Sequence, residues 1–254
     1  MQTSSDFKLS WVILTYNRAD MVKEAVSHNL LNAGHDIDEI IWVDNGSTDS
    51  VRDVMSKFNP DVSILNHENL GVAKGYNRGV VLATGSHIVI TGCDRIMPDN
   101  WAKRFRECFE KISNTALVSC YSQPLDKVPE RRRDTHKNID GIEIIPAMPM
   151  EAKCFPREIL KDVGHIREDF GLYGWEDVEW GNRFERVAKE KGLLTYTLPD
   201  FTAVHLGNEG CEVFNKKEDP EYHAFKQKES GDPRKGEVMA KCRAENYPYY
   251  TPYV

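Results

Sequence analysis

The residues of this chain that could do chemistry include an acid at the end of a predicted strand. Asp44 closes the short apolar run 40–43, which is rich in β-branched and aromatic residues and therefore predicts a buried strand. A polar turn containing Gly46 follows, so Asp44 lies at the carboxyl end of the strand. Open α/β sheets bind ligands at that edge. Taken alone, the stretch fits a ligand site as well as it fits a strand, a turn and a helix that bind nothing.

A second acidic stretch lies in the later half of the chain, where Glu176 and Asp177 fall at the predicted start of a helix. The helix dipole alone favours acidic residues there. It does not explain Trp175, Trp180 and the glycines around them. The stretch is therefore a second candidate for chemistry. By contrast, a lone histidine after apolar residues, as at His205, is more often part of a core than a metal ligand.

Composition limits the class of protein. The chain has 254 residues, 40% hydrophobic and 29% charged, enough for one large α/β domain or two small ones. No run is long and apolar enough to cross a bilayer, and residues 1–8 lack the apolar core of a signal peptide. The net charge of -7 argues against a general nucleic-acid-binding surface but leaves open a local basic groove. Six scattered cysteines without a CxxC pair fit reduced thiols, so we expect a cytoplasmic protein.

Strand and helix patterns alternate through the first half. Their order predicts a mostly parallel, Rossmann-like sheet with helices on both faces. Asn17 is expected to cap the first helix, and Ser47, Thr48 or Asp49 the second. The predicted strands are Leu9–Leu14, Ile40–Val43, Val62–Leu65, His87–Thr91 and Ala116–Tyr121.

The register changes near residue 123. Residues 124–140, including the triple arginine 131–133, predict an exposed loop, followed by strands at 142–145 and 148–155. A helix then runs from Glu176 to a stop at Gly192, and a strand spans 194–198. We predict one domain over residues 1–210, with a first half at about 9–121 and a second at about 140–207. Residues 211–254 form a helical or irregular extension.

The stretch from Asn69 to Gly79 contains three glycines, which permit tight turns and close approach to a ligand. Its spacing matches neither a Walker A loop nor GxGxxG, so it predicts no phosphate motif of those types.

Taken in order, these stretches resemble the inverting GT-A glycosyltransferases of the large family 2, which includes rhamnosyl-, chitin- and cellulose-type enzymes. The resemblance covers roughly residues 9–207, and agreement of several weak motifs in one order is stronger than any single motif. Residues 14–18, 43–49 and 69–79 resemble the three nucleotide loops of that family. Residues 156–164 and 176–179 resemble its acceptor half, and His205 its late histidine.

The resemblance implies a GT-A fold with a small acceptor-side subregion, a UDP- or dTDP-sugar donor, an acceptor hydroxyl and a divalent metal, manganese or magnesium. Asp177 would be the general base that takes the proton of the acceptor hydroxyl. Glu176 would orient that base or, with Trp175, bind the acceptor. The implied donor-nucleotide residues are Thr15, Tyr16, Asn17, Arg18, Asp44, Asn45, Gly71, Lys74, Asn77 and Cys93.

The metal motif departs from the family. Where the family has Asp-x-Asp after the fourth strand, this chain has Gly92-Cys93-Asp94. Magnesium often needs only one or two carboxylates together with phosphate and water, so Asp94 and His205 are the expected metal ligands. A thiol such as Cys93 is a poor ligand for a hard cation.

Three functions remain open at this point. The first is an active inverting glycosyltransferase, and the second is an impaired GT-A domain that binds a sugar nucleotide or glycan. The third, a nucleotidyltransferase, predicts several basic residues at 15–20, where only Arg18 occurs. The acceptor is a glycan, a lipid-linked sugar, a protein or a hydroxylated nucleobase, and the sequence chooses neither among these nor an oligomeric state.

Overall fold

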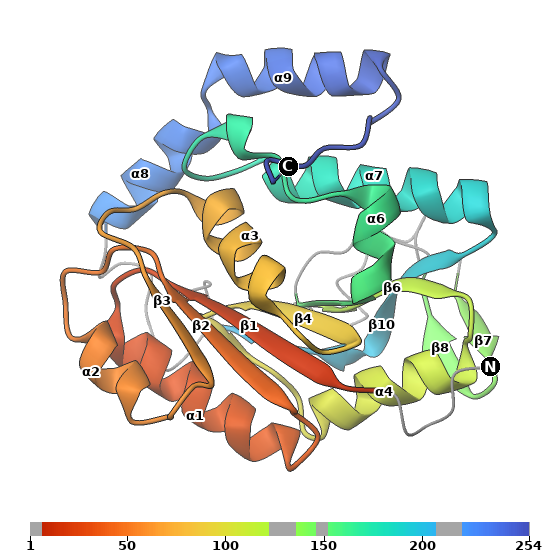
Figure 1. Ribbon diagram of the computed structural model, residues 1–254, viewed down its shortest axis with the longest axis horizontal. Helices are drawn as coiled ribbons and strands as arrows, with labels where there is room; N and C mark the ends of the chain where they lie inside the picture. The colour runs from red at the N-terminus through yellow and green to blue at the C-terminus, as the bar shows by residue number, and fades with distance from the viewer. Residues whose placement is uncertain (1–6, 122–135, 146–151, 207–219, 254) are drawn as a thin grey trace.

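The computed structural model describes residues 7–121, 136–145, 152–206 and 220–253. The first half alternates strands and helices in the order predicted, and Figure 1 shows their arrangement. It comprises β1 (Leu9–Thr15), α1 (Ala19–Ala33), β2 (Glu39–Asp44), α2 (Val51–Ser56), β3 (Val62–Leu65), α3 (Val72–Leu82), β4 (His87–Gly92), β5 (Arg95–Ile96), α4 (Trp101–Lys111) and β6 (Thr115–Tyr121).

The second half supplies the remaining strands and the helix that begins with the acidic pair. Its elements are β7 (Lys137–Ile139), β8 (Ile142–Ile144), β9 (Lys153–Pro156), η3 (Arg157–Ile159), α6 (Leu160–Val163), η4 (Glu168–Phe170), α7 (Glu176–Lys191), β10 (Leu194–Thr202) and β11 (Val204–His205). Two further helices follow, α8 (Pro220–Ser230) and α9 (Pro233–Ala244).

The central sheet has the strand order β10-β6-β9-β4-β1-β2-β3. Strand β9 is antiparallel to both of its neighbours, β4 and β6, whereas the other paired strands of this sheet run parallel. The prediction of a mostly parallel α/β sheet is therefore confirmed. Because the parallel strands all end at one edge, the loops after β1, β2, β3 and β4 meet there.

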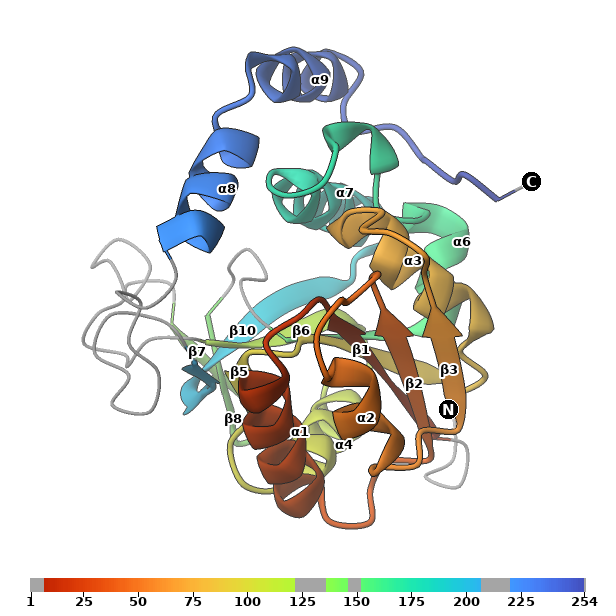
Figure 2. The same ribbon diagram turned by 90° about the vertical axis from the view of Figure 1, so that its left-hand side faces the viewer.

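Helices cover both faces of the sheet, with α1, α2 and α4 on one side and α3, α6 and α7 on the other (Figures 1 and 2). The alternation within β1 explains this division. Leu9, Trp11 and Ile13 belong to the core under α1 and α4, whereas Val12 and Leu14 belong to the core under α3 and α7. Successive side chains of a strand point to opposite faces, so a strand buried on both faces is apolar throughout.

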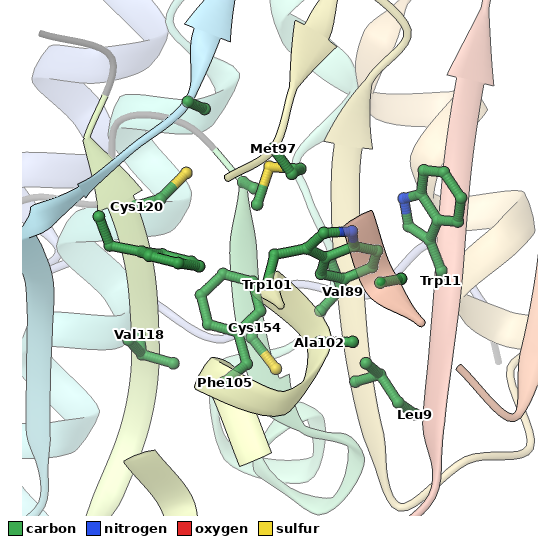
Figure 3. Close-up of a cluster of buried hydrophobic side chains, with 14 of the residues drawn as sticks. Leu9, Trp11, Val89, Met97, Trp101, Ala102, Phe105, Val118, Cys120 and Cys154 are labelled. Carbon is green, nitrogen blue, oxygen red and sulfur yellow. The ribbon is translucent and has the colours of Figure 1, made fainter. Parts of the chain in front are cut away.

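The core under α4 is built around tryptophans, as Figure 3 shows. The rings of Trp11 and Trp101 lie 5.4 Å apart in an edge-to-face arrangement. Each buried indole N–H has an acceptor: Trp11 donates to the Thr91 hydroxyl (2.8 Å), and Trp101 donates to the carbonyl of Asn29 (2.8 Å). The tryptophans therefore add apolar contact to the core without leaving a polar atom unpaired.

The prediction that Asn17 caps the first helix is wrong. Arg18 is the N-cap residue of α1, in a left-handed conformation and without a side-chain cap bond. The amide N–H of Ala19 instead donates to the Asp49 carboxylate (3.0 Å), and the same carboxylate accepts from the N–H of Val51 at the start of α2 (3.1 Å). Asn17 also has a positive φ, and its side-chain oxygen accepts a hydrogen bond from the N–H of Thr48. Side chains thus tie the first two loops together.

The predicted loop at 124–140 is also corrected in part. Residues 137–139 form strand β7, which pairs with β8 as a small antiparallel hairpin. A short strand can pair with its successor across the tight turn at Asp140 and Gly141, both of which have positive φ. The triple arginine 131–133 lies outside the described residues, as do residues 148–151 of the predicted strand 148–155.

The C-terminal helices α8 and α9 lie beside α7 and the loop that precedes it (Figure 2). Trp175 donates its indole N–H to the carbonyl of Ser230 (3.1 Å), and Lys235 donates to the carbonyl of Tyr173. The extension therefore supports the acidic end of α7. No helix in the described ranges is both long enough and apolar enough to cross a membrane.

Candidate active site

A pocket of about 250 Å³ opens at the carboxyl edge of the sheet, between the ends of β1 and β4 and the start of α7. Its walls come from both halves of the chain, which the fold brings together. It is lined by Leu14, Thr15, Tyr16, Asn45, Asn69, Val72, Tyr76, Ile90, Gly92, Cys93, Asp94, Arg95, Ala152, Lys153, Leu172, Tyr173, Gly174, Glu176, Asp177 and Phe225.

One side of the pocket is formed by the loops after β1, β2 and β3. We call residues 15–17, 44–45 and 66–71 the nucleotide wall, after the role that the sequence predicts for it. Thr15 lines the pocket, and its hydroxyl accepts from the indole N–H of Trp42 (2.9 Å). Tyr16 also lines the pocket and is partly exposed. Asn17 and Arg18, predicted to bind nucleotide, are not among the lining residues.

Asp44 belongs to this wall but does not line the pocket. Its side chain is fully buried, and its carboxylate accepts from the guanidinium of Arg52 (2.7 Å) and from the N–H of Ser47 (3.2 Å). The structure thus gives the predicted ligand residue a structural partner. A direct contact of Asp44 with a nucleobase remains a prediction.

Asn45 lines the pocket and joins the second and third loops. Its amide group donates to the Asn69 side chain (2.8 Å) and to the carbonyl of Gly71 (3.1 Å). Its amide oxygen accepts from Asn66 (3.0 Å) and from the N–H of Leu70 (3.1 Å). Four hydrogen bonds leave little capacity for a ligand, so this side chain shapes the nucleotide wall.

Gly71 and Asn77 connect the two halves of the chain. Gly71 has φ +89°, and a Cβ on it would lie 2.7 Å from the carbonyl oxygen of Gly171, so only glycine fits without strain. Asn77 exchanges hydrogen bonds with the backbone of Ile166 (2.8 and 3.0 Å). Neither residue lines the pocket. Lys74, the third predicted residue of this stretch, is exposed on α3 and also lies outside the pocket.

Asp94 and His205, which the sequence separates by 111 residues, are brought together by the antiparallel pairing of β5 with β11. The Oδ2 atom of Asp94 lies 3.0 Å from Nε2 of His205, and its Oδ1 atom accepts from Arg95 (2.7 Å). Two neighbouring ligands of an octahedral ion, each about 2.1 Å from it, are about 3.0 Å apart. The separation in this structure is that of a hydrogen bond, and it is compatible with two ligands of one divalent ion.

Further protein ligands for such an ion are absent from the described part of the chain, where no group of three or more His, Cys, Asp or Glu side chains could hold a metal. The adjacent Cys93 lines the pocket, but burial, followed by the negative charge of Asp94, raises the pKa of its thiol to about 12. A neutral thiol does not bind a hard cation. Oxygen atoms of a bound substrate or of water could supply further ligands.

The start of α7 forms the opposite side of the pocket, and we call residues 171–177 the acidic loop. Asp177 is exposed toward the pocket, whereas Glu176 is buried. The Oε2 atom of Glu176 has no hydrogen-bond partner within the described residues. Burial, followed by the charge of Asp177, raises the pKa of Glu176 to about 7. Trp175, which has positive φ, turns away from the lining and contacts α8.

Tyr173 lies between the two groups of acids. Burial, followed by the charges of Glu176, Asp177 and Asp94, raises the pKa of its hydroxyl to about 12. The field of all three acids at one phenol means that the acidic loop and the end of β4 face the same space. The predicted metal ligand and the predicted base therefore share one pocket.

Sequence reasoning missed two cations of this pocket, Arg95 and Lys153. Arg95 follows Asp94 directly and pairs with it. Lys153 lies on β9 and is almost completely buried. A lysine between Ala152 and Cys154, inside a run predicted to be a strand, was a visible signal, because charged residues are rarely buried without a partner.

The chain is similar in sequence to known glycosyltransferases. The family described as Glycosyl transferase family 2 matches residues 10–167. An uncharacterized glycosyltransferase, MG060 of Mycoplasma genitalium, is 26% identical over 208 residues, which are 74% of this chain and 69% of that protein. Three further curated relatives are 26 to 32% identical, and the matched part spans only 33 to 51% of their length.

Two solved structures share the fold. The mannosyltransferase PcManGT of Pyrobaculum calidifontis, in complex with GDP-Man and Mn2+, superposes with a TM-score of 0.64 at 22% identity over 86% of this chain and 59% of that one. GalNAc-T7 with UDP, GalNAc and Mn2+ superposes with a TM-score of 0.63 at 13% identity, over 78% and 43%. At these identities the likeness supports the fold alone.

Proposed function

Because this chain belongs to glycosyl transferase family 2, we propose that it transfers a sugar from a nucleotide-diphosphate donor to an acceptor hydroxyl with inversion at the anomeric carbon. The observation that carries the proposal is that one pocket is lined by Thr15 and Asn45 from the loops after β1 and β2, by Asp94 after β4 and by Asp177 at the start of α7. Such a transfer needs a nucleotide site, a group that stabilises the leaving diphosphate and a base on the acceptor side. The pocket offers residues for each of the three.

The donor in this proposal is a UDP- or dTDP-sugar. The base would lie against Thr15 and Tyr16, with Asn45 fixing the loops around it. GDP-Man and UDP were found in the two solved relatives, so the fold accommodates more than one base. The preference for uridine or thymidine rests on the resemblance of the loops.

A divalent ion, when bound, would stabilise the negative charge of the departing diphosphate. Asp94 and His205 would hold it, since their facing atoms have the separation of neighbouring ligands. Arg95, paired with Asp94, would keep that carboxylate oriented. Mn2+ in both solved relatives supports manganese as the ion to test first.

Asp177 is the proposed general base. It is exposed at the pocket, where an acceptor hydroxyl can reach it, and its Oδ1 atom is held by the N–H of Val178 (2.8 Å). Glu176, whose pKa is about 7, lies beside it and would hydrogen-bond the acceptor or orient the base. Lys235 supports the backbone of the acidic loop by donating a hydrogen bond to the carbonyl of Tyr173.

Calorimetry tests the first part of the proposal. UDP, dTDP and GDP are titrated into the protein with and without manganese, and UDP or dTDP is expected to bind more tightly with the ion present. The sugar donor of the nucleotide that binds is then incubated with candidate acceptors, and the anomeric configuration of the product is read by NMR. Failure of all three nucleotides to bind would refute the proposal, and retention of configuration would refute the inverting mechanism.

A catalytically impaired, sugar-nucleotide or glycan binding module is the second candidate. Gly92 stands where the family has its first metal-binding carboxylate, and Asp94 is already paired with Arg95 and His205. This candidate predicts nucleotide binding without release of nucleoside diphosphate from any donor. The exposed carboxylate of Asp177 argues for the enzyme, because a binding module has no need of a base there.

A further inference from the structure

Lys153 is a nearly buried, charged residue that the proposed mechanism does not use. The residue is only 6% exposed, yet it lines the pocket. Within residues 7–121, 136–145, 152–206 and 220–253, no hydrogen bond or ion pair is found for its side chain. A buried charge without a partner costs several kcal/mol in general, so it is seldom kept unless something binds to it.

The strand pairing shows which way this side chain points. Lys153 is paired with Ile90 of β4, and Phe155, two residues later, is paired with Ile88. Paired residues of antiparallel strands share a face, and residues two apart on one strand do as well. Ile88, Ile90 and Phe155 belong to the apolar core under α3 and α7. Lys153 therefore enters the pocket through an apolar floor.

The closest polar residue across the other strand offers little help. Ser119 of β6 is paired with Lys153, but its hydroxyl exchanges a hydrogen bond with the Thr197 hydroxyl (2.7 Å). None of the carboxylates around Glu176 and Asp94 forms an ion pair with Lys153. The charge thus faces the space of the pocket rather than another side chain.

The depth of Lys153 indicates which part of a donor would meet it. Its backbone lies level with Ile90, two residues before Gly92, which is roughly 7 Å below the end of β4 at about 3.3 Å per residue. In the proposed function, the diphosphate lies at Asp94, and the anomeric carbon lies between Asp94 and Asp177. The transferred sugar is then the part of the donor that reaches the floor.

We propose that Lys153 binds a carboxylate on the transferred sugar, so that the donor is a nucleotide-activated uronic acid. This inference rests on the proposed function and narrows its donor class. A sugar hydroxyl would satisfy the hydrogen bonds of the ammonium but leave its charge uncompensated in an apolar floor. A carboxylate supplies both hydrogen-bond acceptors and a compensating negative charge. Charge-assisted hydrogen bonds are stronger than those between neutral groups.

Binding measurements test the inference with matched pairs of donors. UDP-glucuronate is compared with UDP-glucose, and UDP-galacturonate with UDP-galactose, with UDP alone as the reference. If dTDP is the nucleotide that binds, the corresponding dTDP-sugars are used. A hydrogen bond to a charged group contributes about 1.5 to 3 kcal/mol, so one of the two uronates is expected to bind about 10- to 150-fold more tightly than its hexose.

Lys153→Met removes the charge and keeps the length of the side chain. It is expected to abolish the preference for the uronate while the affinity for the nucleoside diphosphate alone stays unchanged. Because an uncompensated buried charge disappears, the thermal unfolding midpoint should not fall, and Lys153→Gln is a second uncharged variant for the same comparison. Lys23→Met, which removes an exposed lysine of α1 on the opposite face, is the matched control and should leave both affinities unaltered.

Three outcomes would overturn the inference. Equal affinity of the unaltered protein for both uronates and their hexoses would show that no carboxylate is recognised. Equal losses of UDP and UDP-uronate affinity in Lys153→Met would place the ammonium at the diphosphate instead. If neither UDP nor dTDP binds at all, the proposed function fails together with this inference, which separates that failure from the first two.

Discussion

On the nucleotide wall, Asn45 forms four hydrogen bonds and Asp44 is held by Arg52 and Ser47. Across the pocket, a buried carboxylate oxygen of Glu176 has no hydrogen-bond partner in the described part of the chain, and none is found there for the side chain of Lys153, a residue that is 6% exposed. Both sides therefore bury polar groups, but only one satisfies them internally.

The difference indicates what each side does. A polar group that is fully bonded within the protein fixes a loop and is part of the scaffold. A buried polar group that stays unpaired costs stability, and such a cost is commonly retained where a ligand supplies the missing partner. We infer that the nucleotide wall gives the pocket its shape, whereas the acidic loop and the floor supply the groups that act on the sugar and the acceptor.

The largest effect is expected from Asp177→Asn, which keeps the shape of the side chain but removes its basicity. Loss of a positioned base should lower turnover by about two to four orders of magnitude. The nucleotide affinity of the variant should equal that of the parent within experimental error, because the nucleotide wall is unchanged. The measurement is release of nucleoside diphosphate, with Asp53→Asn, an exposed acid of α2, as the control. Transfer at the parent rate would remove Asp177 from the mechanism.

Glu176→Gln tests whether the unpaired acid destabilises the fold. The pKa of Glu176 is raised from 4.5 to about 7, so the folded protein favours the neutral acid. Stability should therefore be lost as the pH rises from about 4.5 through about 7, because the unfolded chain releases this proton first. Relative to the parent, the glutamine variant should gain up to about 3 kcal/mol between pH 5 and pH 8.

Denaturant unfolding at several pH values provides that measurement. Glu110→Gln, which changes an exposed acid on α4, is the matched control and should follow the parent at every pH. A parallel pH dependence of the parent and Glu176→Gln would mean that Glu176 is solvated or paired in solution, and the contrast between the two sides of the pocket would disappear.

Manganese binding to the protein and to Asp94→Ala tests whether a bound nucleotide completes the metal site. Manganese should bind weakly to the free protein and about 5- to 150-fold more tightly with nucleoside diphosphate present, because binding linkage is reciprocal. Asp94→Ala should abolish this increase. Asp99→Ala, an exposed acid close by in the sequence, is the control. Tight manganese binding that survives Asp94→Ala would exclude Asp94 and His205 as the site, and full activity in excess chelator would exclude a required metal.

The smallest effect is expected on the scaffold side, from Asp44→Ala. It should lower the free energy of unfolding by about 1 to 2 kcal/mol, a modest loss because Arg52 is 44% exposed on its side chain and can be solvated. Arg52→Gln breaks the same ion pair but keeps the carboxylate. Weaker UDP or dTDP binding in Asp44→Ala alone would support a direct contact with the nucleobase. Equal affinity in both variants would leave Asp44 with a scaffold role only.

Much of the fold could be read from the chain, because buried strands carry their signal locally. The apolar run at 62–65 became β3 at the same residues, and the carboxyl ends of β1, β2 and β4 fell where polar residues interrupt the apolar pattern. Strand β8 was predicted, but β7 and its pairing with β8 were not, because Lys137 and Asn138 are polar and depend on a partner strand for their structure.

The candidate site divides in the same way. Glu176 and Asp177 could be proposed from their place at a helix start, and Asp94 from the resemblance to the family, and all three line the pocket. The ion pair between Asp44 and Arg52 could not be predicted, since neither residue's place in the linear pattern indicates its partner. Lys153 was not predicted to lie in the pocket, because a strand pattern shows the alternation of side chains but not which strands lie on either side.

The sequence by itself determined the order of the elements, the family and the residue types at the edge of the sheet, because periodicity and turn chemistry act over a few residues. Only the tertiary structure decided which of those residues meet. The pairing of β5 with β11 sets Asp94 beside His205, and the antiparallel insertion of β9 between β4 and β6 carries Lys153 into the floor. Such contacts depend on strand pairings between distant segments, and a local sequence pattern does not indicate which distant strand will pair with it.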